Sequence, residues 1–317
     1  MIPEHAEHPG DSRSLLLRWR LFQVRAFAAF LVWMGHRARG RDVIVRLRSR
    51  RWSRSLLEFA LAYRRTFTSF TEAQATAANY IAAGHEHPDD IRYHISISET
   101  IRESDYPLLL YLAPIAGRLR RVFDLGGHAG NLFYAYSNRI CFSPDLIWTI
   151  YDLPAKKAAG KDLAAQRAEN RIRFASSILE ASASDVLIAS GSIHYFDQPL
   201  DEMLASLDGL PAHVFVNRSP WSPGNPLITV QDNRSYLVPC KLHSRAQLIA
   251  GMASLGYFLV AEWPVHELKL CVPLYPDLSA RTYSGFYFKQ KMAGADRRTL
   301  GQDSGTVATI GSENSLS

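Results

Sequence analysis

The chain has few cysteines, and those it has are scattered. Its 317 residues include only Cys141, Cys240 and Cys271, with no C-x-x-C pair among them. Isolated cysteines build neither a disulfide framework nor a zinc knuckle and are typical of a reducing compartment. The first residues also lack the basic and apolar segments of a secretory signal. We therefore expect a cytoplasmic protein.

Long uninterrupted apolar runs are also absent. The most apolar N-terminal segment, from Leu21 to Gly35, is short and contains Arg25. A spanning helix needs about 18 or more apolar residues in a row, so no transmembrane helix is expected here. With 47% hydrophobic residues, the chain can still bury one large core and support extensions to it.

Lysine is missing from residues 1–65, which contain fourteen arginines and five acidic residues. The net charge of +6 thus belongs to a basic leader, residues 1–52, and not to the rest of the chain. The leader is interpreted either as a helix packed on the main domain or as an interfacial helix that makes the protein peripheral to the inner membrane. No nucleic-acid recognition motif accompanies the arginines, so no nucleic acid is expected as a partner. The aromatic residues available to an interfacial helix are Trp19, Phe22, Phe27, Phe30 and Trp33.

From Arg121 onward, short apolar runs alternate with helix-length segments. Continuous apolar strands separated by helices indicate a parallel sheet covered on both faces, which is a Rossmann-like, doubly wound α/β fold. Two last strands, within 257–265 and 281–291, have no helix between them and predict an antiparallel C-terminal pair. The five parallel strands are expected at 121–125, 147–153, 172–177, 185–192 and 213–218.

Other parts of the chain are expected to flank this sheet. Residues 53–118 predict a helical cap, in which Ser69 or Thr71 begins the middle helix and Ser96 or Ser98 the third. The main domain would then span residues 119–292, with a Pro/Gly-rich loop after Arg218. Residues 293–317 are rich in glycine and serine and predict a disordered tail.

The turn after the first strand carries the strongest sign of a ligand. In RVFDLGGHAG, Asp124 precedes Gly126, Gly127 and Gly130, and the next strand ends in Asp152. Glycines let the backbone turn sharply beside a ligand, and a carboxylate after the second strand can accept both ribose hydroxyls. The dinucleotide pattern G-x-G-x-x-G is absent. The pattern D-x-G-G-x-x-G instead suits a ligand with an ammonium and carboxylate tail, namely S-adenosylmethionine.

These segments resemble the class I S-adenosylmethionine-dependent methyltransferases. The resemblance rests on RVFDLGGHAGNLFY, WTIYDLP, DVLIASGSIHYFDQPL and the C-terminal strand pair, and it covers roughly residues 65–290. The shorter segments FTSFTEAQ, VNRSPW, ITVQDN and LGYFLVAEW are similar to a group of bacterial methyltransferases often encoded with polysaccharide-biosynthesis genes. The resemblance implies methyl transfer to an oxygen, or less often a nitrogen, of a small molecule or glycan.

The same resemblance implies a cofactor site in four parts. The methionine end would lie on the glycine turn, the ribose at Asp152, the adenine near Ser176, and the sulfonium beside the fourth strand. Three positions depart from the pattern: His128 replaces a glycine, Ser176 stands where an acid often reads adenine, and Asn217 replaces an acid. The cofactor-binding residues implied are Asp124, Gly126, Gly127, Gly130, Asp152, Ser176, Ser190 and Gly191.

The candidate catalytic residue is His194, which follows the fourth strand. An imidazole with the ordinary pKa of about 6.5 can take a proton from an acceptor hydroxyl at neutral pH, although a packed histidine is the alternative. Tyr195, Arg218 and Trp221 would line the acceptor site. No metal is expected, because the polar run from His85 to His94 is interpreted as a loop without a defined third ligand.

Two other functions stay open at this point. One is an NAD-dependent oxidoreductase or sugar epimerase, against which the missing G-x-G-x-x-G and the absence of a Tyr-x-x-x-Lys pair speak. The other is a non-catalytic module that keeps a methyltransferase-like fold for binding. An α/β-hydrolase is not expected, because the serines at 190 and 192 lack the flanking glycines of G-x-S-x-G.

Overall fold

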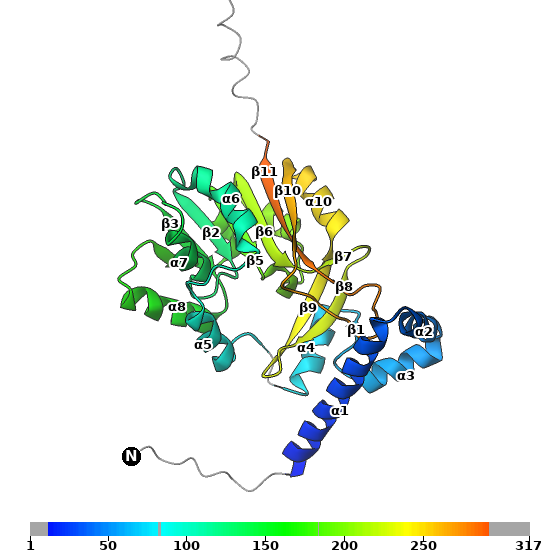
Figure 1. The fold of residues 1–317 in the computed structure, drawn as a ribbon. Helices are drawn as coiled ribbons and strands as arrows, with labels where there is room; N and C mark the ends of the chain where they lie inside the picture. Colours follow the sequence, from blue (N-terminus) through cyan, green and yellow to red (C-terminus); the bar gives the residue numbers. More distant parts are fainter. Residues whose placement is uncertain (1–11, 82–83, 183, 292–317) are drawn as a thin grey trace, which may run out of the picture.

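The computed structural model describes residues 12–81, 84–182 and 184–291. The tail expected at 293–317 lies outside the described residues. Within the described ranges the chain forms a large β-sheet with helices on both faces, a smaller second sheet, and a group of N-terminal helices (Figure 1).

The large sheet has seven strands in the order β10-β11-β6-β5-β2-β3-β4. Strands β2 to β6 run parallel to their neighbours, whereas β11 is antiparallel to both β6 and β10. The predicted Rossmann-like sheet and its antiparallel C-terminal pair are therefore confirmed. The strands are β2 (Arg121–Leu125), β3 (Ile147–Tyr151), β4 (Ile172–Phe174), β5 (Val186–Ser190), β6 (His213–Ser219), β10 (Tyr257–Val265) and β11 (Tyr283–Gln290).

Helices cover both faces of this sheet, as Figure 1 shows. Val122 belongs to one buried cluster, with side chains of α6, α7 and α8, while its neighbour Phe123 belongs to another, with α9 and α10. Consecutive residues of a strand point to opposite faces, so each apolar strand supplies both cores. The helices are α6 (Asp105–Ala116), α7 (Asn131–Ser137), α8 (Pro154–Gln166), α9 (Leu200–Ala205) and α10 (Arg245–Ser254).

A second sheet, which was not predicted, lies mostly after the Pro/Gly-rich loop expected behind Arg218. Its order is β1-β8-β9-β7, with β8 and β9 forming an antiparallel hairpin. The strands were missed because β8 pairs with β1, which is about 160 residues away in the sequence, and because Pro239 lies inside β9. The strands are β1 (Thr66–Phe67), β7 (Trp221–Ser222), β8 (Leu227–Asp232) and β9 (Leu237–Ser244).

The helices before the sheet only partly follow the prediction. Ser69 begins α4 (Phe70–Ala78), where its side chain accepts a hydrogen bond from the backbone N–H of Glu72. The cap expected at Ser96 or Ser98 is wrong, because α6 begins at Asp105, after a separate loop. The polar run expected to be a loop also forms a helix, α5 (Pro88–Ser96), with proline in its first turn, where its missing N–H costs nothing.

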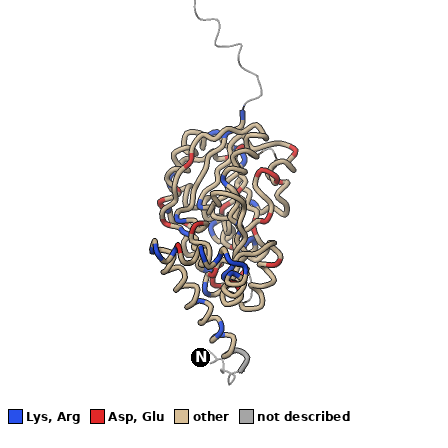
Figure 2. Tube along the Cα trace, turned by 90° about the vertical axis from the view of Figure 1, so that its right-hand side faces the viewer, with Lys and Arg blue, Asp and Glu red and all other residues tan. Residues whose placement is uncertain are grey.

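The described part of the basic leader forms α1 (Ser12–Gly35) and α2 (Ala38–Ser49), and α3 (Arg51–Leu61) runs from its end into the region expected to be the helical cap. One face of α1 packs on the body, because Val24 and Leu31 are buried and Arg25 donates two hydrogen bonds to the Asp232 carboxylate. The leader is thus packed on the main domain, as one of the two interpretations expected. Its arginines lie in the lower part of Figure 2. Among the described residues, no helix combines the length and apolarity needed to cross a bilayer.

Candidate functional site

A cavity of about 710 Å³ lies at the carboxyl ends of β2, β3, β5 and β6. Parallel α/β sheets bind their ligands at this edge. The floor comes from strand ends, while the walls come from the chain around α5 and from the β8–β9 hairpin. Three distant parts of the sequence therefore enclose one space of the size of a small-molecule site.

Most of the predicted site residues line this cavity. Gly130 and Trp221 do not. The predicted residues that line it are Asp124, Gly126, Gly127, Asp152, Ser176, Ser190, Gly191, His194, Tyr195 and Arg218.

One side of the glycine turn faces the cavity, and the other side packs tightly against Ser192 and Asp124. Gly126 has φ +75°, and a Cβ there would lie 2.3 Å from the Cβ of Ser192. A Cβ on Gly127 would lie 2.4 Å from the carboxylate of Asp124. Both positions therefore require glycine, which leaves the backbone of the turn accessible from the cavity.

Gly130 has a structural role behind the turn. It has φ +95° directly before α7, and a Cβ would lie 3.1 Å from the side chain of Ile172. This glycine lets α7 begin close against the sheet, so its contribution to a ligand site is indirect.

Asp124 is almost completely buried beneath the turn, with 1% of its surface exposed. Its carboxylate accepts a hydrogen bond of 3.1 Å from the indole N–H of Trp148. Burial raises the pKa of Asp124 to about 7, because the charged form loses its hydration. A cation bound above Asp124 would recover part of that cost.

Asp152 is held at the tip of the neighbouring strand. One oxygen accepts the backbone N–H of His128 at 2.8 Å, and the other accepts the backbone N–H of Leu153 at 2.7 Å. A carboxylate has about four acceptor positions, so each oxygen can accept a further hydrogen bond. The group is therefore oriented to receive two neighbouring hydroxyls.

An acid that the prediction missed stands behind Ser176. Glu180 accepts hydrogen bonds from the backbone N–H and the hydroxyl of Ser176, at 2.8 and 2.9 Å. Glu180 also closes a capping box with Ser177 at the start of the short 3₁₀ helix Ile178–Ala181. The spacing Ser-x-x-Glu is visible in the sequence and could have identified this residue.

Two arginines, Arg102 and Arg218, line the other end of the cavity. Arg218 donates to the Ser190 hydroxyl at 3.0 Å and lies 3.4 Å from Asp105. Arg102 lines the same cavity without an ion-pair partner within 4 Å among the described residues. Burial and the nearby charge of Arg218 lower the pKa of Arg102, although the carboxylates of Asp105 and Glu267 act in the opposite direction. The Arg102 side chain thus faces the cavity without a direct ion pair.

His194 lies buried in the cavity wall, with its Nδ1 lacking a hydrogen-bond partner. Burial lowers the pKa of His194 to about 3, so the imidazole is neutral at pH 7. Its ring lies 4.0 Å from that of Tyr195, which in turn donates to the amide oxygen of Gln231 on β8. A neutral imidazole keeps a lone pair free to accept a proton.

Trp221 lies elsewhere, so the expectation that it lines the acceptor site is not met. The chain after Arg218 continues as a strand, which turns the indole into the core beside Phe286, with ring centroids 5.2 Å apart. It borders a shallower cavity on another part of the molecule.

Asn217, where an acid was expected, links β6 by hydrogen bonds to the residue before α6 and to β10. Its amide donates to the backbone oxygen of Ser104 at 3.0 Å and accepts from the Trp263 indole at 3.1 Å. A carboxylate could not donate the first of these bonds, which explains the amide in this buried place.

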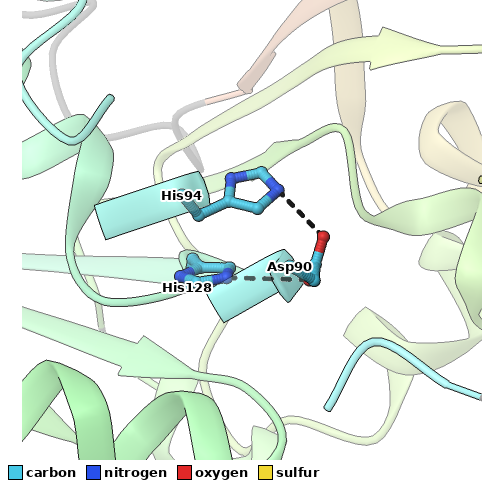
Figure 3. A group of neighbouring side chains, drawn as sticks. All are labelled: Asp90, His94 and His128. Atoms are coloured by element: carbon cyan, nitrogen blue, oxygen red, sulfur yellow. Dashed lines mark ion pairs between the residues drawn. The ribbon is translucent and has the colours of Figure 1, made fainter. Parts of the chain in front are cut away.

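The helix α5 also brings together a polar cluster that the prediction treated as a loop. Asp90, 6% exposed, accepts a hydrogen bond of 2.7 Å from the hydroxyl of Tyr236 and lies 3.2 Å from the Lys156 ammonium. His94 and His128 face the same carboxylate, with Nε2 atoms 3.4 and 3.8 Å away (Figure 3).

No protein-family model matches the chain, and no curated protein sequence does. Three solved methyltransferases are similar in part. An O-methyltransferase of neocarzinostatin biosynthesis is 17% identical with a TM-score of 0.37, over 64% of this chain and 60% of its own. An N1-methyltransferase from Burkholderia thailandensis is 19% identical with a TM-score of 0.39, over 66% and 91%. A C-methyltransferase from Streptomyces coelicolor A3(2) is 14% identical with a TM-score of 0.45, over 66% and 88%.

Proposed function

We propose that the chain is an S-adenosylmethionine-dependent methyltransferase of class I. One observation carries the proposal: a buried, nearly neutral Asp124 lies under an open glycine turn, and Asp152 is fixed at the tip of the adjacent strand. The first suits a cation and the second suits a diol. A ligand that presents both groups a few ångströms apart is S-adenosylmethionine.

The charges of the cavity suit the methionine end. The ammonium would recover the cost of ionising Asp124, while the Arg102 guanidinium is free for the carboxylate. Without these partners, burial disfavours the charged form of Asp124, and Arg102 has no carboxylate within ion-pair distance among the described residues. Binding a zwitterion would stabilise both groups at once.

The nucleoside would extend toward β3 and β4. Asp152 would accept the two ribose hydroxyls, and the Ser176 hydroxyl, which donates to Glu180, would accept from the adenine amine. Glu180 thus supplies, through Ser176, the acid that the sequence pattern lacks at this place.

His194 would remove the acceptor proton. When bound, S-adenosylmethionine supplies an electrophilic methyl group, whose transfer to the acceptor oxygen leaves S-adenosylhomocysteine. The neutral His194 accepts the hydroxyl proton as the O–CH₃ bond forms, and the fixed cavity walls hold the acceptor in line. Because burial lowers the pKa of His194 to about 3, an acidic hydroxyl such as a phenol suits it better than a sugar hydroxyl.

The acceptor is proposed to be a small molecule, with a glycan of polysaccharide biosynthesis as the alternative. The walls facing the cavity are aromatic, which suits stacking on a planar ring or a sugar face. The aromatic wall residues are Tyr93, Tyr195, Phe196, Tyr236 and Tyr283. Transfer assays with phenolic acceptors against nucleotide sugars would choose between the two.

The cofactor proposal can be tested by thermal unfolding. S-adenosylmethionine and S-adenosylhomocysteine at about 100 times their Kd should raise the midpoint, by an amount equivalent to about 2.7 kcal/mol. NAD at the same concentration should leave it unchanged. A shift with NAD alone would favour the oxidoreductase, and no shift with any of the three would contradict a nucleoside site.

We also propose that α1 holds the protein at an anionic membrane surface. Trp19, Phe22, Phe30 and Trp33 are 50 to 63% exposed, and their separations of three, eight and three residues place them on one side of the helix. Just after the helix, the Arg37 guanidinium lies 3.6 Å from the centre of the Trp33 ring. Exposed aromatic rings beside cations suit the headgroup region of a lipid bilayer.

A further inference from the structure

An acid and two imidazoles converge on one wall of the cavity. Asp90 and His94 lie one turn apart on α5, so both point the same way, and His128 reaches them from the glycine turn (Figure 3). We propose that Asp90, His94 and His128 bind a first-row divalent transition-metal ion of the Zn²⁺ type. The binding itself does not depend on the proposed methyl transfer.

The spacing of the three groups fits one ion. One ligand atom from each of them lies within 4.8 Å of the other two. Ligands about 2.1 Å from an ion are separated by about 3.0 to 3.4 Å in octahedral or tetrahedral geometry. His94 Nε2 lies 3.4 Å from Oδ1 of Asp90, which is already in this range, and His128 Nε2 lies 3.8 Å from Oδ2. An ion bound by both carboxylate oxygens therefore needs only a few tenths of an ångström of closure on the His128 side.

His128 is the residue that a purely structural role explains least. It is 5% exposed, and neither of its ring nitrogens has a hydrogen-bond partner. It also has φ +58°, a conformation that costs a non-glycine residue about 1 kcal/mol or more. The chain therefore holds a histidine in a glycine conformation and buries an imidazole whose lone pair has no partner. An ion between His128 and Asp90 would use that lone pair.

Other polar groups also surround the Asp90 carboxylate, and they leave one of its oxygens without a hydrogen bond. Oδ2 of Asp90 accepts no hydrogen bond, although the Lys156 ammonium lies 3.2 Å from it. His85 Nδ1 is 3.8 Å from the same oxygen. Lys156 is the natural competitor for the carboxylate, since an ammonium and a metal ion are both cations. Removing this ammonium should therefore strengthen metal binding, whereas it would only weaken a cluster that is a plain ion pair.

The donor set indicates which ions would bind. Two imidazoles and one carboxylate suit zinc, cobalt, nickel and iron better than magnesium or calcium, which prefer oxygen ligands. Three protein ligands leave at least one position open, and His94 and His128 line the cavity. If the proposed function holds, the open position would take an oxygen of the acceptor and make its hydroxyl more acidic.

The test is calorimetric titration of the chelator-stripped full chain with Zn²⁺, supported by the visible absorption of bound Co²⁺. We expect one ion per chain and at least a tenfold loss of affinity in His94→Ala and in His128→Gly. His128→Gly should fold well, because glycine favours this φ. The exposed His266→Ala is the matched control and should bind as the parent does.

A second variant separates the ion from the ion pair. Lys156→Met should bind Zn²⁺ more tightly than the parent chain, by about tenfold or more. The proposal is overturned if neither the parent nor Lys156→Met binds Zn²⁺, or if His128→Gly binds it as tightly as the parent. Titration of the same samples with S-adenosylhomocysteine reports independently on the cofactor site, so failure of one proposal is distinguishable from failure of the other.

Discussion

Asp124 is buried in the cavity floor, and we expect its raised pKa to make the stability of the protein depend on pH. Its folded pKa of about 7 is raised above the usual 3.8, so between these values the native state holds a proton that the unfolded state has lost. Stability is then fully present below pH 4 and falls as the pH rises through 7, by up to about 1.4 kcal/mol per pH unit. Urea unfolding at pH 5, 6, 7 and 8 measures this slope.

The variant Asp124→Asn provides the comparison. Asparagine keeps an acceptor for the Trp148 indole but does not titrate. The unfolding free energy of the variant minus that of the parent should therefore increase as the pH rises from 5 to 7. A difference that stays constant over this range would mean that the carboxyl group is ionised throughout.

Arg102 should distinguish the amino-acid tail of the cofactor from its nucleoside. Arg102→Met removes the partner proposed for the methionine carboxylate and should weaken S-adenosylhomocysteine about 10- to 100-fold, the typical loss for a charge-assisted hydrogen bond. Binding of 5′-methylthioadenosine, which lacks the tail, should not change. Calorimetry of both ligands measures this.

The exposed Arg92 supplies the control for this measurement. Arg92→Met should bind both ligands like the parent chain. Equal weakening of both ligands in Arg102→Met would place Arg102 away from the methionine end.

At the residue scale, the sequence identified the polar residues that lie near the ends of the parallel strands. Asp124 lies near the end of β2 and Asp152 directly follows β3, so their place in the chain determines their place at the sheet edge. Arg102 was missed, and Asp90 was assigned to a loop, because their positions depend on the packing of α5 and of the loop before α6, which no local pattern reports. Glu180 alone carried a readable signal, its capping-box spacing.

At the element scale, the start of α4 gives a direct check of the local structure. Ser69 accepts the hydrogen bond of the Glu72 N–H, whereas Thr71 lies inside the helix. Ser69→Ala should therefore destabilise the fold by about 1 kcal/mol in urea unfolding, and Thr71→Ala should change it by much less. Equal losses in the two variants would contradict the assigned cap.

The exposed side of α1 should respond to loss of its aromatic rings. The double variant Trp19→Ala/Trp33→Ala removes two exposed indoles without touching the buried side of the helix, so folding should be kept. Sedimentation with phosphatidylserine vesicles should fall at least severalfold, while neutral vesicles retain little protein in either case. Undiminished sedimentation of the variant would contradict membrane contact by α1.

The second sheet shows why some elements escape sequence reasoning. Strands β8 and β9 include Pro239 and meet at a turn where Arg234 has φ +68°. Strand β8 also pairs with β1 from the N-terminal region, and pairing between segments so distant in the sequence leaves no local pattern. The strands of the parallel core, in contrast, are short continuous apolar runs separated by helices, and this alternation allowed them to be predicted.

At the scale of the whole molecule, the cavity has a floor and walls that come from different parts of the fold. The floor comes from the doubly wound sheet, which binds ligands at its carboxyl edge whatever the chemistry. The walls come from α5, the loop before α6 and the β8–β9 hairpin. The positions of the residues proposed to bind the cofactor were therefore predictable from the sequence, while the proposed acceptor side depends on parts whose positions only the structure provides.

The central claim is that this cavity holds S-adenosylmethionine with its ribose on Asp152. It is tested most directly by calorimetric titration of S-adenosylhomocysteine into the parent chain and into Asp152→Asn, which keeps the size of the side chain. We predict one site in the parent and at least tenfold weaker binding in the variant, with the fold unchanged by circular dichroism. Equal affinity in the two chains, or no binding to the parent, would contradict the account.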